Sequence, residues 1–207
     1  MRLSQLSREE LVNTTTHAAG ALAGALGGAF LIVIASLRGD ARLIVGAAIF
    51  VTTLILLYSA SALYHAVTTE SLKRRLKILD HAAIYLLIAG SYTPFTLAGL
   101  RGGWGWSLFG VIWGLAVLGV IFKLFFTGRF RRTSTAIYIA MGWLALIAAM
   151  PLVRALSPAT LAWLVAGGIT YTLGTLFYHS RRAYAHGIWH LFVLGGSVCH
   201  ALAVATL

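Results

Sequence analysis

Seven long apolar runs fill almost the whole of this chain and are separated by short gaps. They lie at roughly 14–37, 43–67, 78–100, 104–126, 134–153, 159–178 and 185–207. Each has about 20 to 25 residues, enough for an α-helix to cross the hydrocarbon core of a bilayer. Because backbone polar groups in lipid must bond within their own segment, the runs predict an all-α membrane protein, a seven-transmembrane helix bundle.

The composition agrees with a membrane location. Of the 207 residues, 59% are hydrophobic and only 10% are charged, and the mean hydropathy is +0.87. The gaps leave no room for a soluble domain or a nucleic-acid module, so we expect one domain over 1–207 and no nucleic-acid partner. Residues 1–12 are expected to lie on the cytoplasmic membrane surface. The net charge of +11 then indicates contact with anionic lipid.

Lysine and arginine are distributed unequally between alternate gaps. Twelve of the sixteen lie before the first run, in the second, fourth and sixth gaps or, for Lys123, near the end of the fourth run. The other four are Arg38, Arg42, Arg101 and Arg154. Because positive loops stay in the cytoplasm, this asymmetry predicts a cytoplasmic N-terminus and, after seven spans, a C-terminus outside.

Small residues and prolines mark how the helices pack. Gly20, Gly24 and Gly28 recur every four residues, which favours a seam where two membrane helices approach closely. Ser157 followed by Pro158 is typical of a helix start. Pro94 falls inside the third run and should bend that helix.

The histidines gather at one predicted membrane face. Six of the seven lie at cytoplasmic helix ends: His17, His65, His81, His179, His186 and His190. Since His186 and His190 are four residues apart, both imidazoles project from one helix face and can bind one metal ion. His65 completes a set of three, the usual number for a zinc site with an open position. The sequence thus predicts Zn²⁺ bound by His65, His186 and His190.

The remaining histidines carry no such pattern. His179 and His200 fit structural residues or lipid headgroup contacts, and the spacing assigns no role to His17 or His81.

Two more polar residues fall near the same face. Asp80 is one of only five carboxylates, and the other four lie in gaps or in the N-terminal segment. A carboxylate at membrane depth needs a partner. That partner is either the basic cluster Lys73–Lys77 or a water at the zinc, for which Asp80 would act as general base. Ser61, one turn before His65, either bonds its own backbone or hydrogen-bonds within the site.

As a set, the motifs resemble those of the haemolysin III family, bacterial relatives of the progestin and adipoQ receptors in a superfamily that includes alkaline ceramidases. The resemblance covers essentially the whole chain. The matching stretches are Asn13-Thr-Thr-Thr-His17-Ala-Ala-Gly20, Ser61-x-x-x-His65, Asp80-His81-Ala-Ala-Ile-Tyr85, Ala89-Gly-Ser-Tyr-Thr-Pro-Phe95 and His186-x-x-x-His190.

The resemblance implies a seven-helix bundle in the bacterial inner membrane, with a cytoplasmic-side zinc on His65, His186 and His190 and water as fourth ligand. Asp80 would match the carboxylate near that water and Ser61 the serine beside it. The chain lacks the long N-terminal region of the animal receptors, so we do not expect ligand reception of their kind.

Two classes of function follow from the sequence. The first is a zinc-dependent hydrolase that cleaves a lipid amide or ester entering from the inner leaflet, with catalytic Asp80 and Ser61. The second is a non-catalytic protein, either a haemolysin-type pore or a regulator or sensor of membrane lipids. No stripe of charged residues runs through the apolar segments, which disfavours a pore.

Overall fold

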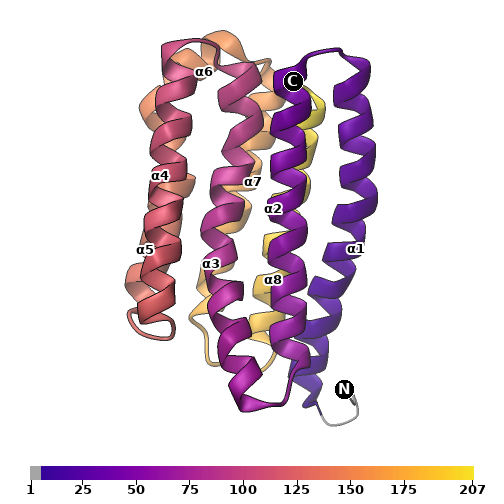
Figure 1. Cartoon of the computed structure of the whole chain (residues 1–207), viewed down its shortest axis with the longest axis vertical. Coiled ribbons are helices and arrows are strands. Elements are labelled where there is room, and N and C mark those ends of the chain that lie inside the picture. The colour runs from indigo at the N-terminus through magenta and orange to yellow at the C-terminus, as the bar shows by residue number, and fades with distance from the viewer. Residues whose placement is uncertain (1–5) are drawn as a thin grey trace.

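A computed structural model describes residues 6–207 as a bundle of long helices (Figure 1). Within this part of the chain, seven helices are long and apolar enough to cross a membrane. The prediction of an all-α fold with seven spans is therefore confirmed. The elements are α1 (Arg8–Leu37), α2 (Ala41–Ala66), α3 (Glu70–Pro94), the π-helical turn Phe95–Gly99, α4 (Gly103–Phe126), α5 (Arg131–Gly142), the 3₁₀ turn Leu144–Ala148, α6 (Ala149–Ala155), α7 (Pro158–Tyr178) and α8 (Ala185–Ala205).

The helices run up and down, so alternate connections lie at the same end of the bundle (Figure 1). The start of α1 and the α2–α3, α4–α5 and α7–α8 connections share one end, which we call the basic end. The last helix, α8, packs against both α7 and α1, and α1 also packs along α2. The first, second and last spans are thus neighbours, and residues far apart in sequence meet.

The first helix begins at Arg8, before the start of its apolar run at residue 14. Ser7 caps α1 by accepting a hydrogen bond from the backbone N–H of Glu10 (3.2 Å). Glu9 and Glu10 in the first turn add favourable interactions with the helix dipole. Residues 8–12 of the predicted surface segment are therefore helical, while residues 1–5 lie outside the described part of the chain.

The glycine seam of α1 is confirmed. Cβ atoms added at Gly20, Gly24 and Gly28 would collide with side chains of α2 or α8, and the one at Gly20 would lie 2.6 Å from Leu194 Cδ2. The absence of side chains at these positions lets the neighbouring helices approach α1 closely.

Two prolines interrupt or begin helices as predicted. Ser157 caps α7 by accepting a backbone hydrogen bond, and Pro158 is its first residue. In the third span the regular α-helix ends at Pro94 and continues as the π-helical turn Phe95–Gly99. Gly46 of α2 approaches this point, since a Cβ there would lie 2.6 Å from Pro94 Cα.

The fifth span is broken, which corrects the expectation of one continuous helix over 134–153. At Trp143 the α-helix gives way to a 3₁₀ turn before α6 resumes. The Tyr92 hydroxyl from α3 satisfies backbone groups freed there. It lies 2.9 and 2.8 Å from the carbonyls of Met141 and Gly142 and accepts the N–H of Ala145 (3.0 Å). This contact between helices stabilises the break, and Pro151, which has no N–H to donate to the carbonyl of Ile147, favours it locally.

Candidate metal centre

Three histidines meet near the basic end of the bundle. His65 ends α2, whereas His186 and His190 lie in the first turns of α8. One ring nitrogen from each lies within 4.8 Å of the other two, and His65 and His190 are buried. The fold therefore brings together the three residues selected from the sequence, and the group could bind a metal ion.

The Glu10 carboxylate fixes the orientation of the first of these rings. His65 Nδ1 lies 2.5 Å from Glu10 Oε2, and Lys73 Nζ donates to the other carboxylate oxygen (2.7 Å). Because a carboxylate only accepts, the proton of the neutral imidazole sits on Nδ1. His65 Nε2 then carries a lone pair, and this atom is buried without a hydrogen-bond partner among the described residues. A metal ion would satisfy it.

Thr16 likewise fixes the orientation of the His190 ring. Thr16 Oγ1 lies 3.1 Å from His190 Nδ1 and 2.8 Å from the carbonyl oxygen of Val12. Since the single hydroxyl proton goes to that carbonyl, the hydroxyl oxygen accepts from His190 Nδ1–H. The Nε2 atoms of both His65 and His190 are thus left as ligands, the arrangement found around metal-binding imidazoles.

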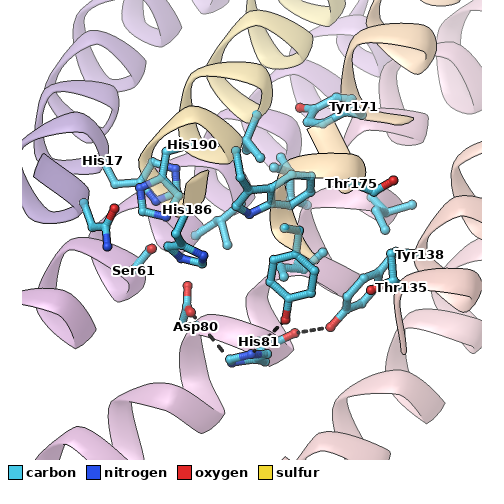
Figure 2. A pocket seen from close by; sticks show the side chains of 18 of the residues that line it. His17, Ser61, Asp80, His81, Thr135, Tyr138, Tyr171, Thr175, His186 and His190 are labelled. Atoms are coloured by element: carbon cyan, nitrogen blue, oxygen red, sulfur yellow. Dashed lines mark hydrogen bonds and ion pairs between the residues drawn. The ribbon is translucent and has the colours of Figure 1, made fainter. Parts of the chain in front are cut away.

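The catalytic candidates line the cavity that adjoins the histidines (Figure 2). Its volume is about 550 Å³. Figure 2 shows the Ser61 side chain and the Asp80 carboxylate lying near His186. Away from the histidines the wall becomes apolar and aromatic, formed by Leu87, Ile88, Tyr92, Trp143, Tyr171 and Val193. The space joins a polar, histidine-lined end to an apolar end.

The environment of Asp80 bears on its two possible roles. Its nearest basic side chain is His81, with 3.7 Å between Asp80 Oδ2 and His81 Nδ1. That nitrogen hydrogen-bonds instead to the Lys77 carbonyl (2.7 Å). Lys73 is paired with Glu10. No lysine or arginine of the described residues lies within 4.0 Å of the Asp80 carboxylate, so the ion pair with the basic cluster is not formed and the carboxylate lies on the cavity wall.

Three residues of α1 that had no assigned role belong to this centre. Glu10 and Thr16 hold ligand rings, and His17 stacks on His190 with 3.5 Å between ring centroids. A spacing of three and four indicates two of them, because Glu10 and His17 share one face of α1 with Asn13. A polar stripe on an apolar helix indicates a buried polar site.

Of the two histidines set aside as structural, His179 fits that description. It is exposed, and its Nε2 lies 3.0 Å from Thr135 Oγ1. His200 differs because it lies at the apolar end of the cavity, 5.4 Å from the Tyr171 ring, and its Nδ1 has no partner among the described residues.

Comparison with known proteins agrees with the motifs. The family described as Haemolysin-III related matches residues 6–201. "Hemolysin-3" of Bacillus cereus is 45% identical over 197 residues, which cover 95% of this chain and 90% of the relative. "Hemolysin-3 homolog" of Bacillus subtilis (strain 168) is 46% identical over 191 residues, covering 92% and 90%. Human "Monocyte to macrophage differentiation factor" is 27% identical over 205 residues, covering 95% and 83%. With its seven spans and buried histidine cluster, this chain belongs to the haemolysin-III family.

Proposed function

We propose that this protein is a zinc-dependent intramembrane hydrolase that cleaves an amide or ester bond of a membrane lipid at the cytoplasmic leaflet. The observation that carries the proposal is the fixed orientation of two imidazoles. Glu10 and Thr16 bind the Nδ1 atoms of His65 and His190, which leaves both Nε2 atoms as ligands beside a cavity. His65 Nε2 is also buried without a hydrogen-bond partner among the described residues, and a metal ion would satisfy it.

The ligand set favours zinc. Three neutral imidazoles without a thiolate are the usual protein ligands of a zinc site that keeps an open position. Such an ion supplies a Lewis acid, which polarises a carbonyl and makes water nucleophilic near neutral pH. His65, His186 and His190 would hold it.

Asp80 would then transfer a proton, and Ser61 would orient the Asp80 carboxylate. Asp80 accepts a proton as the water oxygen forms a bond to the carbonyl carbon of the lipid. It returns that proton to the leaving nitrogen or oxygen as the amide or ester bond breaks, which gives a fatty acid and an amine or alcohol. The Ser61 hydroxyl, close to Asp80 in Figure 2, would orient the carboxylate.

The shape of the cavity supports a lipid substrate. About 550 Å³ is within the usual range for a small-molecule site and admits part of an acyl chain. Apolar side chains line the end away from the histidines, where such a chain would lie. The excess of lysine and arginine at the basic end supports a cytoplasmic location for that end and for the N-terminus.

Purified protein in neutral detergent tests the proposal. We expect zinc-dependent release of fatty acid from acyl lipids, abolished by a chelator and restored by zinc. A zinc-loaded protein that is inactive on ceramide-like and phospholipid substrates would instead favour a non-catalytic regulator. Zinc-independent leakage of dye from liposomes would favour a pore.

A further inference from the structure

Two basic side chains line the polar end of the cavity beside the histidine cluster. Lys77 lies three residues before Asp80, and Arg131 is the first residue of α5. Arg131 is exposed, but it lines the cavity, whereas the other exposed basic residues at this end of the bundle do not: Arg74, Arg75, Arg129, Arg132, Arg181 and Arg182. The general positive excess of cytoplasmic loops does not explain why Lys77 and Arg131 alone face the cavity.

Neither side chain has a carboxylate partner in the described part of the chain. The salt bridges that lysine and arginine form there are Lys73 with Glu10 and Arg101 with Asp40. Lys77 and Arg131 therefore bring positive charge to a partly enclosed space without forming a salt bridge there, although Asp80 lies on the same cavity wall. A bound anion could pair with both groups directly.

Contacts with Tyr178 hold Arg131 near the metal centre. The Arg131 Cζ atom lies 5.2 Å from the centroid of the Tyr178 ring, and its Nη2 donates to the Tyr178 carbonyl (3.4 Å). The same ring lies 6.1 Å from that of His186. One aromatic ring therefore separates the guanidinium from a proposed metal ligand.

A third cation strengthens the positive potential of this wall. Lys123 is only 2% exposed, and its ammonium donates to Ser134 Oγ (2.6 Å) and lies 5.8 Å from the Tyr138 ring. Tyr138 lines the cavity. No described carboxylate lies within 4.0 Å of this ammonium. At low dielectric such a charge attracts an anion over several ångströms.

We infer that Lys77 and Arg131 bind the phosphate of a lipid headgroup, so that the ligand class is an acyl lipid bearing an anionic phosphate. The guanidinium offers a planar pair of donors that matches phosphate oxygens, and the ammonium adds a point charge. The identification of this lipid as a substrate rests on the proposed hydrolase function, whereas its binding does not. The phosphate would lie at the basic end, the carbonyl at the histidines and the acyl chain at the apolar end.

The test measures binding and needs no turnover. Metal-free protein in neutral detergent is titrated with short-chain phosphatidic acid and with diacylglycerol of the same acyl chains. We expect phosphatidic acid to bind at least about tenfold more tightly, since charge-assisted hydrogen bonds to phosphate commonly contribute that much. Lys77→Gln and Arg131→Gln should each weaken phosphatidic acid binding by about tenfold and leave diacylglycerol binding unchanged.

Two neighbouring variants serve as matched controls. Arg75→Gln and Arg132→Gln remove the same charge from exposed positions outside the cavity, and each should change affinity by less than about twofold. Lys77→Arg keeps the charge and should keep most of the affinity, which separates loss of charge from misfolding.

Three outcomes would overturn the inference. The first is equal affinity for the two lipids. The second is an equal loss in the control variants, which would reduce the effect to surface charge. The third is inorganic phosphate binding as tightly as phosphatidic acid, which would indicate a free-anion site. If zinc or hydrolysis is absent while headgroup selectivity depends on Lys77 and Arg131, the hydrolase proposal alone fails.

Discussion

The Glu10 carboxylate lies 2.5 Å from His65 Nδ1, although 54 residues lie between Glu10 and His65 in the sequence and the two belong to different helices. The contact joins the first turn of α1 to the last turn of α2. It also fixes which nitrogen of His65 carries the proton. The residue that orients a candidate metal ligand therefore comes from a helix that supplies no ligand itself.

Replacement of this carboxylate should weaken metal binding without removing a ligand. We expect Glu10→Gln to lower zinc affinity by about 10- to 100-fold, because the amide loses the negative charge that makes the imidazole a stronger donor. Competition with a chromogenic chelator measures the affinity. Glu70→Gln, which neutralises an exposed carboxylate, should leave it unchanged. Equal affinities of wild type and Glu10→Gln would remove Glu10 from the site.

The three histidines should account for about one zinc per chain. His65→Ala, His186→Ala and His190→Ala should each reduce the zinc content severely, since two imidazoles and water hold zinc poorly. His179→Ala should retain it. Elemental analysis of purified variants measures the content, and full zinc in any two ligand variants contradicts the assignment. Chelation should also lower the melting temperature, because bound metal stabilises only the folded state.

Asp80→Asn separates a catalytic carboxylate from a supporting one. The variant should keep its zinc, because no proposed ligand is lost. It should lose about 10²- to 10⁴-fold in the rate of lipid hydrolysis, because an amide cannot accept the proton from water. Zinc content, melting temperature and hydrolysis are measured on one preparation. Undiminished hydrolysis would exclude Asp80 from the mechanism, and lost zinc or stability with no effect on rate per zinc would indicate a supporting role.

The orientation in the membrane can be tested with single cysteines. After Cys199 is replaced by serine, a cysteine at Leu207 should react with an impermeant reagent from outside. A cysteine in the 127–133 loop should react only from the cytoplasmic side. The expectation follows from the distribution of lysine and arginine. Labelling of position 207 from the cytoplasm would reverse the topology and place the histidine cluster at the outer leaflet.

The close approach of α2 to the proline in α3 should be sensitive to a single methyl group. Gly46→Ala would place a Cβ 2.6 Å from Pro94 Cα, and backbone cannot rotate away as a side chain can. We expect a loss of about 1–3 kcal/mol in the free energy of unfolding. Gly110→Ala, in open space within α4, should be neutral or slightly stabilising. Measuring thermal unfolding of both variants shows whether the packing is as tight as described.

Much of the architecture follows from the sequence because bilayer thickness fixes helix length. The seven spans and the meeting of His65 with His186 and His190 were predictable from hydropathy and alternation alone. The start of α1 was not, because its polar first turn lies outside the apolar run. Ser7 with Glu10 three residues later is a capping pattern that indicates the true beginning.

Two other features could not be predicted from the sequence because they depend on contacts between helices. The fifth span breaks at Trp143, eight residues before Pro151, and the backbone groups freed there bond to Tyr92 from another helix. The role of Thr16 depends on the rotation of α1 against α8. Residue spacing within one run carries no information about either contact.

The position of the histidine cluster also has a consequence for the order of events during biosynthesis. His65 lies in the second helix, but His186 and His190 lie in the last. A three-ligand site cannot exist until nearly the whole polypeptide has left the ribosome and its final segment has entered the bilayer. Metal would therefore bind only after insertion, and occupancy of the site would report that both ends of the chain have come together.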